Sequence, residues 1–103
     1  MDQMTAEDRA ALEARWLDLT RQVMPAEAQA RRWPVVNDHC FQRILLDHAC
    51  GGCWYDHIPD RPAYKKAPAN VLLRAVAAGE AALKGRLDLH AMNRASLVWR
   101  GKA

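Results

Sequence analysis

Residues 38–52 read DHCFQRILLDHACGG, and this stretch decides the fold. Its apolar side chains recur every three or four residues, which predicts a helix from about His39 to Cys50. Asn37 or Asp38 can cap the first turn of this helix. Two glycines follow it, at the positions where helices commonly end in a left-handed residue. The centre of the chain is therefore predicted to be an amphipathic helix that packs against other helices.

The predicted helix has two different faces. His39, Arg43 and Asp47 are spaced four residues apart, so they stack along its polar face, where Arg43 can form an ion pair with Asp47. A histidine titrates near neutral pH, so this face predicts an anion site or, in a small enzyme, an acid/base pair of His39 and Asp47. A solvated face with one salt bridge is the simpler alternative. The opposite face includes His48, which we expect to be a core histidine, and carries Cys40, Phe41, Ile44 and Leu45.

Before this helix, the sequence predicts another long one. Thr5 and Asp8 resemble a capping box, and the helix is expected to end before Pro25, with a short helical turn possible over 25–32. Its apolar stripe is narrow, as in helices that pair with a single partner, and consists of Leu12, Trp16, Leu19 and Val23. The stripe therefore supports an alternative function, a protein-interaction or homodimerisation module.

After the central helix, an irregular loop over 51–68 is predicted from its three prolines. Pro68 suits the first turn of a third long helix that reaches about Lys84, and Asp88 can cap a short C-terminal helix. Gly79 lies on the buried stripe of the third helix, which indicates a close approach of another helix. We predict a mostly α, compact domain with three long helices, a short C-terminal helix and this loop.

Length and composition agree with that prediction. A chain of 103 residues is one domain, here with residues 1–37 as an N-terminal helical arm and 38–102 as the core. It has 19 Ala and 11 Leu but only ten Val, Ile and Thr together, which disfavours a β-sandwich or barrel. It shows no signal peptide and no apolar run of membrane-spanning length, so we expect a cytoplasmic protein without a membrane partner.

The charge is unevenly distributed along the chain. The net charge of +3 divides into −4 over residues 1–60 and +7 over residues 61–103. Such a basic segment with aromatic side chains predicts a non-enzymatic binding module for an anionic partner, nucleic acid or a nucleotide phosphate. The candidate binding residues are Arg43, Trp54, Asn93, Arg94, Ser96, Trp99, Arg100 and Lys102.

One short motif raises the question of a metal. Cys50, Cys53 and His57 form a C-x2-C-x3-H pattern that is compatible with zinc. A zinc domain normally shows a second closely spaced ligand pair, and this sequence has none. We expect no cofactor, with zinc as the alternative.

Residues 38–102 also resemble a known group of proteins. The strings DHCFxRIxLD, which begins at Asp38, and NRxSLxWRGK, which begins at Asn93, are similar to those of a small bacterial family of uncharacterised proteins. Members are sometimes labelled as GCN5-related N-acetyltransferases, so the resemblance implies an acetyltransferase activity as a further alternative. Such enzymes hold acetyl-coenzyme A with a turn of the type R/Q-x-x-G-x-G/A, which this sequence lacks.

Overall fold

The computed structural model describes residues 4–102, which form helices and no strand. The long helices are α1 (Ala6–Asp18), α3 (Asp38–Cys50), α5 (Ala69–Leu83) and α6 (Leu89–Trp99). The shorter elements are a π-helical turn (Leu19–Val23), α2 (Met24–Ala28), a 3-10 turn (Trp54–Asp56) and α4 (Ala63–Lys66). The prediction of a mostly α domain is confirmed. The C-terminal helix is longer than expected, and part of the 51–68 segment is helical.

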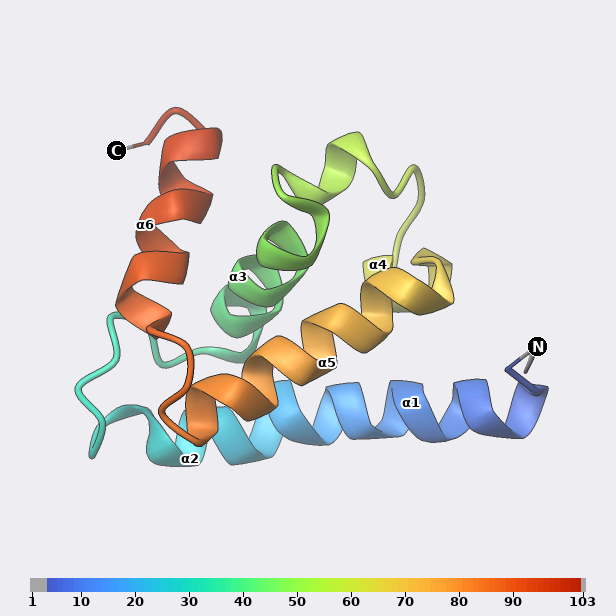
Figure 1. Ribbon diagram of the computed structural model, residues 1–103, viewed down its shortest axis with the longest axis horizontal. Coiled ribbons are helices and arrows are strands. Elements are labelled where there is room, and N and C mark those ends of the chain that lie inside the picture. The colour runs from blue at the N-terminus through green and yellow to red at the C-terminus, as the bar shows by residue number, and fades with distance from the viewer. Residues whose placement is uncertain (1–3, 103) are drawn as a thin grey trace.

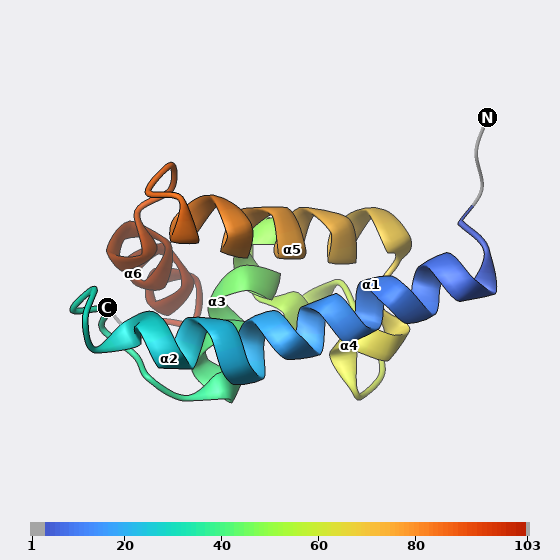
Figure 2. The same ribbon diagram turned by 90° about the horizontal axis from the view of Figure 1, so that it is seen from below.

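The helices are arranged around α3. Helices α1 and α5 run side by side and in the same direction (Figures 1 and 2), and α3 packs against α5 and against the π-helical turn. Helix α6 packs on another side of α3. None of the helices over residues 4–102 combines the length and the apolarity needed to cross a membrane.

Local sequence signals set the helix ends. The backbone N–H of Asp8 donates to the Thr5 hydroxyl at 3.0 Å, and the N–H of Thr5 donates to the Asp8 carboxylate at 3.2 Å, so the predicted capping box is formed. Gly51 ends α3 with a φ of 68°. At the start of α6, the Asp88 carboxylate accepts the N–H groups of His90 and Ala91.

The first helix, α1, ends at Asp18, before Pro25 as predicted, but the helical path continues through this proline without a break. The chain passes through the π-helical turn directly into α2, in which Pro25 lies in the first turn. Within the π-helical turn the N–H of Met24 donates to the carbonyl of Leu19, five residues earlier. The wider turn also moves the apolar stripe by one residue, so Met24 is fully buried while Val23 is only partly buried.

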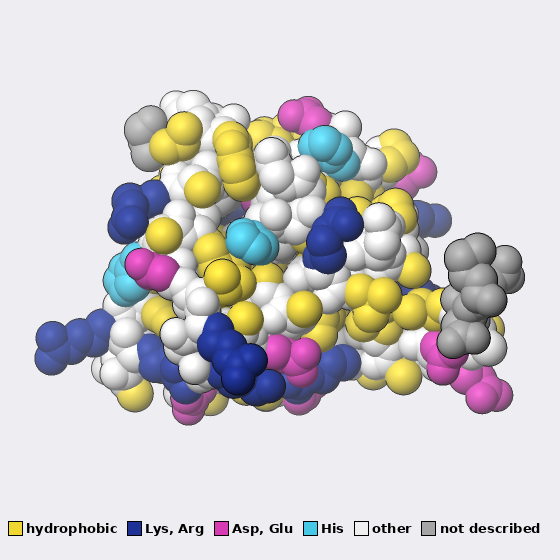
Figure 3. Space-filling view, in the orientation of Figure 1, with side chains coloured by type: hydrophobic (Ala, Val, Ile, Leu, Met, Phe, Trp, Pro, Cys, Tyr) yellow, Lys and Arg dark blue, Asp and Glu magenta, His cyan; other side chains and the backbone are white. Residues whose placement is uncertain are grey.

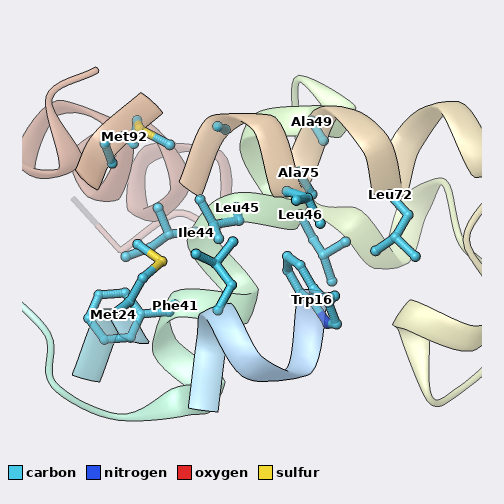
Figure 4. Close-up of a cluster of buried hydrophobic side chains, with 14 of the residues drawn as sticks. Trp16, Met24, Phe41, Ile44, Leu45, Leu46, Ala49, Leu72, Ala75 and Met92 are labelled. Atoms are coloured by element: carbon cyan, nitrogen blue, oxygen red, sulfur yellow. The ribbon is translucent and has the colours of Figure 1, made fainter. Parts of the chain in front are cut away.

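The stripe of α1 packs inside the chain. Trp16 has no exposed surface and joins the core of α3 and α5 (Figure 4). Leu19 is also fully buried in this core, and Leu12 is partly buried against it. The homodimer alternative requires this stripe to be exposed to a second copy of the chain. In the structure the stripe is instead covered by α3 and α5 of the same chain.

Gly79 marks the close approach expected on α5. A Cβ atom at this position would lie 2.6 Å from Cδ2 of Leu19 and 3.1 Å from Cδ1 of Leu45. We therefore expect Gly79→Val to lower the free energy of unfolding by about 1–3 kcal/mol, because the added carbons overpack the core. Ala77→Val, on the exposed face of the same helix, should change it by about 0.5 kcal/mol or less. Urea unfolding measures both, and equal midpoints for the two variants would contradict the close approach.

Candidate functional site

The Asp47 carboxylate is fully buried and accepts four hydrogen bonds. Its Oδ2 accepts the Ser96 hydroxyl at 2.6 Å and Nε of Arg100 at 2.8 Å. Its Oδ1 accepts the backbone N–H of Trp54 at 2.9 Å and Nη2 of Arg100 at 3.1 Å. One carboxylate thus joins α3, the segment after it and the C-terminal end of α6. We call this the Asp47 network, which consists of Arg43, Asp47, the backbone of Trp54, Asn93, Ser96 and Arg100.

Arg43 enters the network through α6. Its Nη1 donates to the Ser96 hydroxyl at 2.6 Å and its Nη2 donates to Oδ1 of Asn93 at 2.8 Å. The predicted ion pair with Asp47 is not formed, because the Ser96 hydroxyl lies between the two side chains. Among the residues that the structure describes, no carboxylate lies within salt-bridge distance of Arg43. Two guanidinium groups and one carboxylate leave the network with one excess positive charge.

Arg100 is held in its charged form. Its hydrogen bond to Asp47 is the main cause that raises its already high pKa, against a smaller opposing effect of burial. The guanidinium also lies 5.1 Å from the centre of the Tyr55 ring, in a cation–π contact. A hydrogen bond with the Cys53 side chain raises the pKa of Tyr55. The Arg100 guanidinium therefore stays positively charged next to the Asp47 carboxylate at neutral pH.

A pocket of about 370 Å³ lies beside the network, between α1, α3 and the 54–64 segment. We call it the α1–α3 pocket. Its volume falls within the ~300–1,000 Å³ of typical small-molecule sites. The lining is rich in cationic and aromatic groups and contains no Asp or Glu; it consists of Trp16, Arg21, His39, Gln42, Arg43, Leu46, Trp54, Arg61, Pro62, Ala63 and Tyr64.

The cationic groups of the pocket differ in how firmly they are held. The Arg61 guanidinium lies 4.9 Å from the centre of the Trp54 ring. Arg21 approaches Asp38 only to 4.0 Å, and half of its side chain is exposed. Arg43 is held by two hydrogen bonds to α6 and is half-buried. Arg43 is therefore the fixed positive charge of this pocket, while the others can move toward a ligand.

The structure brings together five of the candidate binding residues, all of them in the Asp47 network: Arg43, Trp54, Asn93, Ser96 and Arg100. Arg94, Trp99 and Lys102 are exposed and do not join them. On the face shown in Figure 3, Lys and Arg side chains are scattered between other groups. The basic C-terminal third therefore does not form one continuous patch on that face.

His39 and Asp47 are not brought together as an acid/base pair. His39 is mostly exposed and its Nδ1 lies 3.4 Å from Asp38, whereas Asp47 is buried against α6. The prediction for His48 is wrong, since this side chain is exposed. Sequence reasoning also missed Arg21 and Arg61 as pocket residues. The aromatic and proline-rich 51–68 segment was the one signal that pointed toward this part of the pocket.

The three cysteines are not grouped with other potential metal ligands in the described part of the chain. No group of three or more His, Cys, Asp or Glu side chains over residues 4–102 is arranged to hold a metal ion. The Cys53 thiol instead donates to the carbonyl of Trp99 at 3.4 Å. Burial, followed by the charge of Asp47, raises the pKa of Cys50, so the neutral thiol is favoured at this position.

Comparisons with known proteins add no function to these observations. No protein-family model, curated protein or solved structure matches this chain. The chemistry of the α1–α3 pocket and of the Asp47 network is therefore the basis for a functional proposal.

Proposed function

We propose that this protein is a binding module for a small anionic ligand, with a nucleotide phosphate as the most concrete choice. The observation that carries the proposal is the half-buried Arg43, which lines the α1–α3 pocket and has no carboxylate partner among the described residues. A buried charge without a counter-charge is costly. An anion in the pocket would offset that cost, and Arg21 and Arg61 could add direct contacts.

The aromatic lining supports a ligand that also carries a planar ring. Trp54 and Tyr64 line the same pocket as the arginines. Base–aromatic stacking contributes roughly 1–3 kcal/mol in nucleic-acid-binding proteins. A single nucleotide, free or at an unpaired position of a strand, combines such a ring with a phosphate.

The test is the binding of adenosine monophosphate by isothermal titration calorimetry at ~50 mM salt. We expect Arg61→Gln and Arg21→Gln each to raise the dissociation constant by about tenfold or more, because a hydrogen bond to a charged group contributes ~1.5–3 kcal/mol. Both side chains are largely exposed, so the fold should be unaffected. Raising the salt concentration should also weaken binding.

Arg94→Gln is the matched control, because it removes the same charge from an exposed position on α6 outside the pocket. It should bind like the wild-type protein. The proposal is wrong if the wild-type protein binds no nucleotide at low salt. It is also wrong if Arg94→Gln lowers the affinity as much as Arg61→Gln, since binding would then depend on the general positive charge of the C-terminal third.

A further inference from the structure

Two residues belong both to the α1–α3 pocket and to the Asp47 network. Arg43 and Trp54 line the pocket, and each of them is also hydrogen-bonded within the network. The other members of the network, Asp47, Asn93, Ser96 and Arg100, do not line the pocket. The pocket and α6 are therefore physically connected, although α6 contributes no lining residue.

The direction of the Arg43 side chain is determined by α6. Both of its hydrogen-bond acceptors, the Ser96 hydroxyl and the Asn93 amide oxygen, belong to that helix. Ser96 is fully buried and donates in turn to Asp47, so its own hydroxyl has a fixed orientation. If the Ser96 hydroxyl were lost, the charge at the wall of the pocket would lose one of its two acceptors.

The position of Trp54 is determined by the same carboxylate. The Trp54 N–H donates to Oδ1 of Asp47, the oxygen that also accepts Nη2 of Arg100. Arg100 further contacts the ring of Tyr55, the residue next to Trp54. The C-terminal end of α6 thus contacts the segment that places the Trp54 ring in the pocket.

We infer that Asp47, Ser96 and Arg100 are positioning residues of the α1–α3 pocket. Ligand binding in this pocket is then coupled to the packing of the C-terminal end of α6 against α3. The inference rests on the proposed function, because it concerns the same pocket. Coupling between two sites is reciprocal. A ligand in the pocket should therefore stabilise the end of α6, and a change at the end of α6 should weaken ligand binding.

The experiment compares Ser96→Ala with the wild-type protein, using adenosine monophosphate as the probe. The substitution removes the hydroxyl that bridges Arg43 and Asp47 but replaces no residue that lines the pocket, and it should raise the dissociation constant by about fivefold or more. Leu89→Ala is the matched control, since Leu89 is buried on the same helix but lies outside the network. At a temperature well below its unfolding midpoint, this control should bind like the wild-type protein.

The reciprocal effect is measured by hydrogen exchange. The backbone amides of Arg100, Gly101 and Lys102 donate to carbonyls of α6. Their exchange rates therefore report how firmly the C-terminal end of α6 is held in place. Saturating nucleotide should slow their exchange in the wild-type protein by about fivefold, and by less in Ser96→Ala.

The outcomes separate the two proposals. If the wild-type protein binds no nucleotide, both are overturned. If it binds but Ser96→Ala has an unchanged affinity, or if the exchange of residues 100–102 does not respond to the nucleotide, only the coupling is overturned. Equal weakening by Leu89→Ala would also overturn the coupling, because the effect would then be general destabilisation.

Discussion

Replacing Asp47 with alanine is expected to lower the free energy of unfolding by about 3–5 kcal/mol, because it leaves buried donors and a buried charge without a partner. The carboxylate accepts four hydrogen bonds and is the only carboxylate paired with Arg100 among residues 4–102. A domain of this size is typically stable by about 5–15 kcal/mol, so the loss would be a large fraction of the total. Urea unfolding, followed by circular dichroism at 222 nm, measures the change.

Glu80→Ala is the control for Asp47→Ala. Glu80 also pairs with an arginine across two helices, Arg15 at 3.0 Å, but both side chains are about two-fifths exposed. An exposed pair of this kind contributes about 0–1 kcal/mol. In the double variant Asp47→Ala/Arg100→Ala the loss should be smaller than the sum of the two single losses, since the unpaired arginine is removed as well. A loss for Asp47→Ala no larger than that for Glu80→Ala would contradict a stabilising role of the network.

Replacing Trp16 with alanine is the second change with a large expected effect, again about 3–5 kcal/mol. Trp16 is fully buried, and its indole lies in the cluster shown in Figure 4, with Leu46 of α3 and Leu72 of α5. Removing the indole leaves a cavity in the core, and the surrounding helices can move only partly to fill it. Because ~1 kcal/mol shifts the midpoint of a domain of this size by roughly 4–8 °C, thermal unfolding should show a fall of roughly 12 °C or more.

Trp99→Ala is the matched control, since it makes the same substitution at a position where 41% of the side chain is exposed. It should lower the midpoint by only a few degrees. Comparable losses for the two variants would show that Trp16 does not hold α1 on the core.

The helices could be predicted because their signals are local. The Thr5–Asp8 capping box, Gly51 with its positive φ, and Asp88 at the start of α6 each act within a few residues of the chain. Apolar periodicity likewise placed Phe41 and Ile44 in the core, where the structure has them. The fold class follows from such features without any knowledge of which helices meet.

The site could be predicted only in part, because it depends on which helices meet. Asp47 lies on the polar face of α3, and the sequence does not show that α6 covers this face with Ser96 and Arg100. His48, one residue later, lies on the face that periodicity assigns to the core but is exposed, because no helix covers it fully. The sequence suggested that residues of the NRxSLxWRGK string bind an external ligand. In the structure three of them, Asn93, Ser96 and Arg100, form hydrogen bonds to side chains of α3.

The π-helical turn has a consequence for comparing this chain with other sequences. It contains one residue more than an α-helix needs to connect the same two segments, as a single-residue insertion would produce. A relative that lacked one residue between 19 and 23 would form an ordinary helix, with the counterparts of Trp16 and Met24 seven residues apart. An alignment of such a pair should therefore open a one-residue gap inside the helix, a place where gaps are usually penalised.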